Sequence, residues 1–194
     1  MNPSMPATSN STRQLIPRML YEYAVAGAVL VMMGHLIASL WQLDWILGSW
    51  SFPFTLMVVV ACMVMVLLTL RREEEHVAFG RAFGLALLVG WFTSLGFNLF
   101  ILLFFNVFHP EHVEAFVDLE IEQSIQTVEM VGFDVDAFGR EKMTSLCRDL
   151  SRWFLTPLGQ AAHALAAIVW VTFVALIVAF ILRRPPTTTA GFVG

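Results

Sequence analysis

Residues 84–108 read GLALLVGWFTSLGFNLFILLFFNVF and contain no Asp, Glu, Lys or Arg. A helix rises about 1.5 Å per residue, so a run of about 20 apolar residues crosses the roughly 30 Å of hydrocarbon in a bilayer. Three other runs have similar length and character: residues 23–43, 53–70 and 158–182. The sequence therefore predicts an all-α integral membrane protein, built as a bundle of four transmembrane helices.

Composition favours a single membrane domain over residues 21–184. Hydrophobic residues make up 58% of the 194-residue chain and charged residues 13%, against about 45–50% and about 25% in soluble domains. The basic residues form no stripe that could follow a phosphate backbone, so we expect no nucleic-acid partner. Residues 1–20 and 185–194 are predicted to be disordered tails, because Ser, Thr, Asn and Pro open the first and two prolines open the second.

The positions of Lys and Arg predict the orientation in the membrane. Seven arginines flank the start of the first run, the connection between the second and third runs, and the end of the fourth: Arg13, Arg18, Arg71, Arg72, Arg81, Arg183 and Arg184. The other four basic residues lie in the long connection before the fourth run: Arg140, Lys142, Arg148 and Arg152. Because basic residues favour the cytoplasmic side, both termini are predicted to be cytoplasmic. Aromatic residues are expected at the interfaces, with Trp41, Trp45, Trp50 and Trp153 at the outer one and Tyr21 and Tyr23 at the inner one.

The long connection, residues 109–153, is predicted to form an extracytoplasmic amphipathic helical arm. It holds ten acidic and four basic residues. Two helices are expected, one between Pro110 and Gly132 and a second that ends near Trp153. Their apolar residues recur at helical spacing: Val113, Phe116, Val117, Ile121, Ile125 and Val128 in the first helix, and Met143, Leu146, Leu150 and Trp153 in the second.

The acidic face of this arm has three interpretations. It suits solubility, a cationic partner or a divalent ion. Glu111, Glu114 and Asp118 share one helix face and form a candidate for a weak calcium site, although the sequence has no EF-hand loop.

Three polar residues inside the predicted spans lie at a common depth. His35, Asn98 and His163 each stand roughly 20 Å from the cytoplasmic boundary at about 1.5 Å per residue. Polar side chains are unfavourable against lipid, so we expect all three to face the bundle interior and to hydrogen-bond. They could serve as interhelical contacts, or they could form a proton relay or small polar pocket with Gln160 and Asn106 above it. Ligation of a haem by His35 and His163 is a weaker alternative, and we expect no cofactor.

Small residues predict where helices approach closely. Gly80 and Gly84 form a GxxxG pattern at the start of the third span, and Ala162 and Ala166 lie four residues apart on the fourth. Packing within the bundle is favoured over dimerisation. Cys62 and Cys147 lie too far apart in the predicted topology to form a disulfide. We find no Cys or His pair with the spacing of a zinc, haem c or redox motif, so no metal site is expected.

The chain resembles a family of bacterial inner-membrane proteins catalogued as a domain of unknown function. The resemblance covers residues 21–185 and is most specific at the small and aromatic residues VAFGRAF of positions 77–83. It also includes the long acidic connection and the arginines that close the fourth helix. This chain departs from the usual lysine-rich pattern of the family, since Lys142 is its only lysine. The resemblance implies a four-helix fold in a bacterial inner membrane and assigns no catalytic or binding residue.

Two functional hypotheses remain open. The sequence has no HExxH, GxSxG or glycine-rich phosphate motif and no acidic or basic residue deep in a span. We therefore expect no catalytic residues and interpret the chain as a non-enzymatic structural or accessory component. Its expected partners are membrane lipids and either another membrane protein or a second copy. The alternative is a transporter of a small solute or of protons that uses His35, Asn98 and His163.

Overall fold

The computed structural model describes residues 9–41, 50–74, 76–132 and 139–183, and these residues form helices and their connections without a strand. The long helices are α1 (Ser9–Trp41), α3 (Ser51–Glu73), α4 (Phe79–Leu103), α5 (Val113–Met130), α7 (Arg140–Phe154) and α8 (Pro157–Leu182). Between α4 and α5 lie a π-helix, η1 (Phe104–Phe108), and a 3₁₀ turn, η2 (Pro110–His112). The predicted all-α class is confirmed.

Four helices are long and apolar enough to cross a membrane, which confirms the predicted spans. They cover Ile16–Leu40, Ser51–Glu73, Phe79–Phe108 and Pro157–Leu182. The first helix begins earlier than predicted, at Ser9, so the prediction of a disordered tail is wrong for residues 9–20. Once a helix has formed, each further residue adds a hydrogen bond without a new nucleus, so the polar residues before the span can extend it. Residues 1–8 and 184–194 lie outside the described residues.

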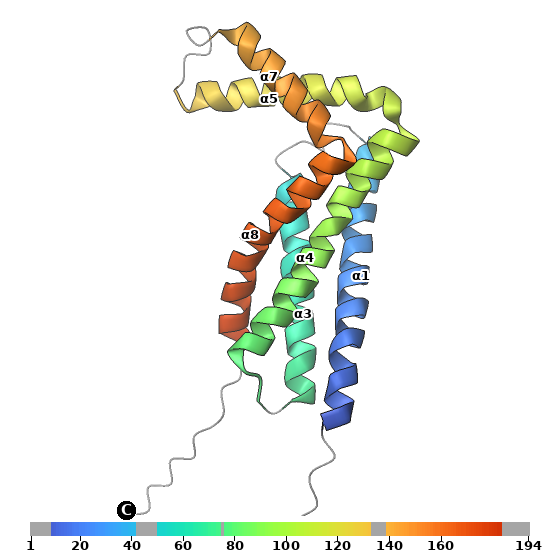
Figure 1. Ribbon diagram of the computed structural model, residues 1–194, viewed down its shortest axis with the longest axis vertical. Helices are drawn as coiled ribbons and strands as arrows, with labels where there is room; N and C mark the ends of the chain where they lie inside the picture. The colour runs from blue at the N-terminus through green and yellow to red at the C-terminus, as the bar shows by residue number, and fades with distance from the viewer. Residues whose placement is uncertain (1–8, 42–49, 75, 133–138, 184–194) are drawn as a thin grey trace, which may run out of the picture.

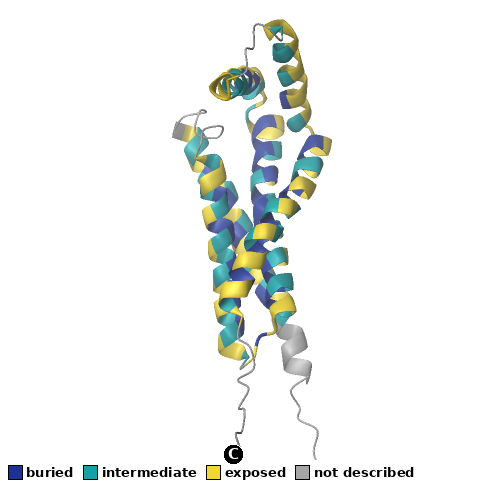
Figure 2. Ribbon diagram, turned by 90° about the vertical axis from the view of Figure 1, so that its left-hand side faces the viewer, coloured by how far each residue is buried: buried dark blue, intermediate teal, exposed yellow. Residues whose placement is uncertain are grey.

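Helix α4 forms the centre of the bundle. It contacts α1, α3 and α8, and in Figure 1 it crosses between them. One core lies between α3, α4 and α8, where Met63, Val89 and Val171 are fully buried. The outward surfaces of the spans remain apolar and exposed, as at Leu165, Val169 and Phe173 of α8. Figure 2 shows the buried residues on the inward sides of these helices. This distribution suits helices whose outer surfaces face lipid.

The glycines that permit close helix contact differ from the predicted ones. A Cβ atom at Gly96 of α4 would collide with the backbone oxygen of Ala28 in α1. At Gly27 of α1 it would lie 2.6 Å from Oγ1 of Thr93 in α4. A Cβ at Gly80 or Gly84 would meet nothing within 4 Å, so the prediction that these two pack inside the bundle is wrong for the part of the chain that the structure describes.

Helix α8 packs on α4 through other small residues than the predicted pair: Ala164, Ala167, Ala175 and Ala179 are buried on α8, and Ala82, Ala86 and Gly90 are buried on α4. Ala166 is exposed and Ala162 only half-buried, so the predicted packing role of Ala166 within the bundle is also wrong. In addition, Nε1 of Trp91 in α4 donates a hydrogen bond to the backbone oxygen of Ala164 in α8 at 2.9 Å. The GxxxG and AxxxA patterns give the spacing of small residues, but the tertiary arrangement decides which side of each helix meets a neighbour.

Helices α5 and α7, here called the arm, lie at one end of the bundle. The start of α1 and the end of α8 lie at the opposite end (Figure 1). The apolar side of α5 covers the end of α4 in a second core that contains these buried residues: Phe100, Ile101, Phe104, Phe105, Phe116, Val117, Ile121 and Leu155. The two predicted helices of the connection are therefore present, and α5 is fixed to the bundle by its apolar side.

Candidate functional site

A polar pocket lies between α3, α4, α5 and α8 at the arm end of the bundle. Its volume is about 350 Å³. The lining residues are Ser51, Phe52, Thr55, Ser94, Phe97, Asn98, Ile101, Phe116, Glu120, Phe154, His163, Ala167 and Trp170. Asn98 and His163, two of the three polar residues predicted to lie at a common depth in the membrane, are in this set.

Asn98 and His163 are hydrogen-bonded to each other across the pocket wall. Nδ1 of His163 lies 2.8 Å from Oδ1 of Asn98, and because an amide oxygen only accepts, the imidazole donates. The amide nitrogen of Asn98 donates to the backbone oxygen of Ser94 at 3.3 Å. The His163 ring packs against Phe97 and Phe154, at centroid distances of 6.0 and 5.3 Å. This contact joins α4 to α8. Within the described part of the chain, Nε2 of His163 has no hydrogen-bond partner.

His35 is buried but does not join this pair. Its Nδ1 lies 2.8 Å from the backbone oxygen of Val31 and its Nε2 lies 2.9 Å from Oγ of Ser51. A carbonyl only accepts, so Nδ1 carries the hydrogen and Nε2 accepts from the serine hydroxyl. His35 lines a separate pocket of about 450 Å³ with Trp50 and Met57. The histidines of the haem alternative therefore line different pockets, with Ser51 common to both.

The predicted polar residues above this layer have structural partners. Nε2 of Gln160 donates to the backbone oxygen of Phe154 at 2.7 Å, and Nδ2 of Asn106 donates to that of Leu155 at 3.1 Å. Neither residue lines the polar pocket. Both instead fix the connection between α7 and α8.

Glu120 and Thr55 line the pocket but were not predicted from the sequence. Burial raises the pKa of the Glu120 carboxyl above its ordinary value. Oγ1 of Thr55 is buried without a hydrogen-bond partner in the described structure. The signal for Glu120 is its place on α5, four residues after Phe116 and three after Val117, which puts it on the buried side of that helix. The pocket thus joins a carboxyl, an imidazole, an amide and an unpaired hydroxyl.

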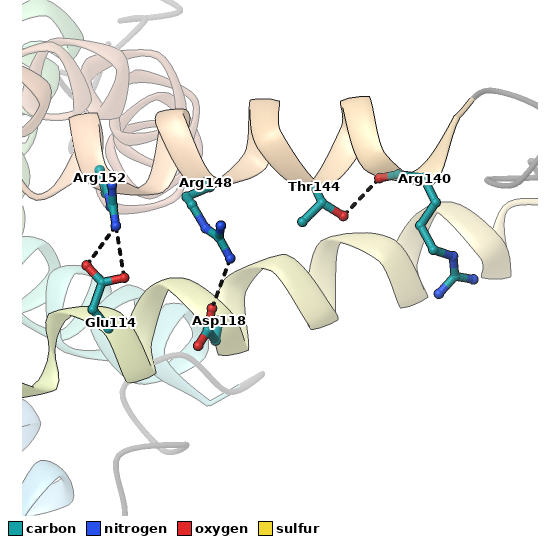
Figure 3. Close-up of polar contacts among 6 residues, drawn as sticks. All are labelled: Glu114, Asp118, Arg140, Thr144, Arg148 and Arg152. Carbon is teal, nitrogen blue, oxygen red and sulfur yellow. Dashed lines mark hydrogen bonds and ion pairs between the residues drawn. The ribbon is translucent and has the colours of Figure 1, made fainter.

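Ion pairs connect the two helices of the arm (Figure 3). Nη2 of Arg148 lies 3.6 Å from Oδ1 of Asp118, and Nη2 of Arg152 lies 2.9 Å from Oε1 of Glu114. A third pair joins Arg140 to Glu129 at 3.0 Å. The sequence suggested a cationic partner for the acidic face of α5. At Glu114, Asp118 and Glu129, this partner is the neighbouring helix α7 of the same chain.

The predicted calcium ligands do not converge. Glu114 and Asp118 face arginines of α7, whereas Oε1 of Glu111 lies 2.9 Å from Nδ1 of His109. Glu111 belongs instead to a different group, His109, Glu111 and His112, whose ligand atoms all lie within 4.8 Å of one another. The prediction that no histidine pair has metal-ligand spacing is wrong, because His109 directly precedes the turn η2 and His112, three residues later, is its last residue.

The ion pairs orient α7 so that its apolar side faces away from α5. Arg140, Arg148 and Arg152 are separated by multiples of four residues and lie on one side, while the predicted apolar residues lie on the other. Leu146, Leu150 and Trp153 are 60%, 55% and 45% exposed. The second amphipathic helix therefore has the predicted apolar side, but no described residue covers it.

These features define a multi-pass α-helical membrane protein: four apolar spans, a polar pocket between them and a helical arm at one end. The model of the DUF4199 family, described as a protein of unknown function, matches residues 22–184, and the chain belongs to this family. Comparison with curated proteins and with solved structures gave no match. The family resemblance seen in the sequence is thereby confirmed.

Proposed function

We propose that the chain is a non-enzymatic accessory component of the bacterial inner membrane, with its arm on the extracytoplasmic side, and that the arm binds another membrane protein. The exposed apolar side of α7, formed by Leu146, Leu150 and Trp153, carries this proposal. Apolar surface is unfavourable in water by about 25 cal/mol per Å², so a partner that covers these side chains gains stability from their burial.

The arm cannot hide this surface by turning α7 over. Such a rotation would separate the ion pairs that Arg148 and Arg152 make with α5. It would also place arginines on the outer side of the helix. The apolar side is therefore held outward by these ion pairs together with the packing of Cys147 and Phe154 of α7 against the second core.

The position of α7 favours a partner that is itself in the membrane. The apolar side ends at Trp153, close in the chain to Leu158, an exposed residue in the first turn of α8. Leu158 begins the outward, apolar surface of a candidate span. A partner that covers both Trp153 and Leu158 would therefore contact the arm and the membrane-spanning part of α8 at the same time.

The distribution of charge supports the proposed orientation. Arg71, Arg72, Arg81 and Arg183 all lie at the bundle end opposite the arm, at or next to the ends of candidate spans. Basic residues in these places favour the cytoplasmic side. In the sequence, seven arginines flank the span ends that are predicted to be cytoplasmic and four basic residues lie in the arm, where three of the four pair with acidic groups.

Site-specific photo-crosslinking in intact cells tests this function. A photoreactive residue at Leu150 is expected to give one protein adduct whose mass differs from that of two copies of the chain. The same residue at Gln126, an exposed position on α5, is the control and should give none. An adduct of twice the chain mass would show that this surface binds a second copy of the chain and not another protein. An adduct with lipid alone would overturn the proposal.

A second candidate function rests on the polar pocket. Glu120 and His163 supply a carboxyl and an imidazole to one cavity, which is the combination needed to accept and release a proton or to bind a small polar solute. In lipid vesicles that contain a pH-sensitive dye, this candidate requires a proton flux that Glu120→Gln and His163→Gln both reduce. His35→Gln is the matched control because His35 lies outside this pocket. Absence of any flux by the unchanged protein rejects this candidate.

A further inference from the structure

We propose that His109, Glu111 and His112 form a zinc site at the junction between the third membrane span and the arm. Their ligand atoms lie within 4.8 Å of one another. The site does not depend on the partner proposed for α7, and it lies outside the residues that line the polar pocket.

The local backbone brings the two histidines to one side of the chain. Pro110 opens the 3₁₀ turn η2, with His109 directly before it and His112 as its last residue. Residues i and i+3 eclipse each other in a 3₁₀ turn, because it has about three residues per turn. The ring centroids of His109 and His112 accordingly lie 5.4 Å apart.

The preceding π-helix supports both rings. The backbone N–H of His109 donates to the oxygen of Phe104 at 2.7 Å, which closes the last π-type turn of η1. The Phe104 ring is buried, and its centroid lies 5.0 Å from that of His109 and 6.4 Å from that of His112. The imidazoles therefore rest on a fixed aromatic surface, which reduces the ordering that a bound ion would require.

The donor set selects for zinc over calcium. Two imidazole nitrogens and one carboxylate oxygen are the three protein ligands of many zinc sites that keep a position open for water. Calcium takes six to eight oxygen ligands, which this group does not provide. The Glu111 carboxylate already lies 2.9 Å from Nδ1 of His109. Since the Glu111 side chain is 61% exposed, it has room to rotate and bring its oxygen to the roughly 2.0–2.2 Å bond length of a zinc ligand.

A zinc ion here would act on the arm as well as on the turn. His109 follows the end of the span, and His112 immediately precedes α5. One ion bound to both would link the two sides of the turn and limit changes in the angle between span and arm.

Equilibrium dialysis of Zn²⁺ against the purified, tag-free chain in detergent tests the site. The unchanged chain should bind one zinc per chain, and Glu111→Gln and His112→Gln should each weaken binding at least about tenfold. His76→Gln is the matched control, since His76 is an exposed histidine at the opposite end of the bundle. Ca²⁺ should not compete.

A thermal melt of each variant supplies the second readout. Without zinc, all four proteins should melt at the same temperature, because Glu111 is exposed and His112 half-exposed. Zinc should raise the melting temperature of the unchanged chain and of His76→Gln alone, since a ligand stabilises the folded state to which it binds. The proposal is overturned if His76→Gln weakens binding as much as His112→Gln does, or if the unchanged chain does not saturate below about 1 mM zinc.

Discussion

Nη2 of Arg152 lies 2.9 Å from Oε1 and 3.0 Å from Oε2 of Glu114, a carboxylate 38 residues earlier in the chain. This contact joins the end of α7 to the beginning of α5, beside the bundle. Together with the pair between Arg148 and Asp118, and with Cys147 and Phe154 packed against the second core, it orients α7 so that Leu150 faces outward.

Charge reversal tests this arrangement. Arg152→Gln should lower stability by less than about 1 kcal/mol, because both side chains are more than half exposed and water screens the pair. Glu114→Arg should loosen α7 more strongly, since it places a third positive charge beside Arg148 and Arg152. Combining Glu114→Arg with Arg152→Glu should recover part of the loss. Hydrogen exchange of the α7 amides measures each effect, and equal exchange in all variants would show that the ion pairs do not orient the helix.

The contact between α1 and α4 should depend on Gly96. Gly96→Ala is expected to destabilise the bundle by about 1–3 kcal/mol, because the added methyl group meets the backbone of Ala28, which cannot move without shifting α1. Gly84→Ala is the matched control on the same helix. A methyl group there meets nothing within 4 Å, so this change should be neutral or stabilise by up to about 1 kcal/mol through helix propensity. Melting temperatures in detergent should separate the two variants, and a similar loss in both would contradict the close contact.

The hydrogen bond between Asn98 and His163 should give a measurable coupling energy. A double-mutant cycle with Asn98→Ala and His163→Ala is expected to yield about 0.6 kcal/mol, the average for polar contacts between membrane helices. The matched cycle with His35→Ala and His163→Ala should yield a smaller value, since these two histidines share no hydrogen bond. Equal coupling energies in both cycles would mean that His35 is coupled to His163 as strongly as Asn98 is, which would contradict the separation of His35 from this pair.

Glu120 should make stability depend on pH. Burial raises the pKa of its carboxyl in the folded state above that of the unfolded chain. Between these two pKa values the folded state binds more protons, so stability falls as pH rises through this interval. Glu120→Gln should remove this part of the pH dependence and stabilise the protein at neutral pH, whereas Glu122→Gln, an exposed neighbour, should not. Melting temperatures from pH 4 to about pH 8 measure the effect, and identical curves for both variants would contradict it.

The sequence predicted the elements well because their signals are local. Runs of apolar residues gave the four spans, and helical spacing gave α5 and α7. The site was less predictable because its residues come together through tertiary structure. Ser51 reaches His35 from a separate helix, and Glu120 enters the pocket only because α5 crosses the end of the bundle.

The two amphipathic helices of the arm illustrate the same limit. When apolar residues recur at helical spacing, that side of the helix is expected to be buried against other parts of the protein. This holds for α5, where Phe116 and Val117 are fully buried. It does not hold within the described chain for α7, where the arginines meet α5 and Leu150 faces outward. Periodicity identifies an apolar side, but the contacts of the helix with its neighbours, here the ion pairs with α5 and the packing of Cys147 and Phe154, determine which way that side faces.

The π-helix Phe104–Phe108 gives the junction between the third span and the arm a tolerance for one residue of chain length. A π turn holds about one residue more than an α turn. Deleting one residue between positions 104 and 108 would therefore let α4 continue as a regular helix, and the residues that follow would keep nearly the same direction around its axis. One residue deleted from the regular part of α4 would instead rotate everything after it by about 100°. The wide turn is thus the place in this span where the chain can lose a residue without redirecting the outer surface of the molecule.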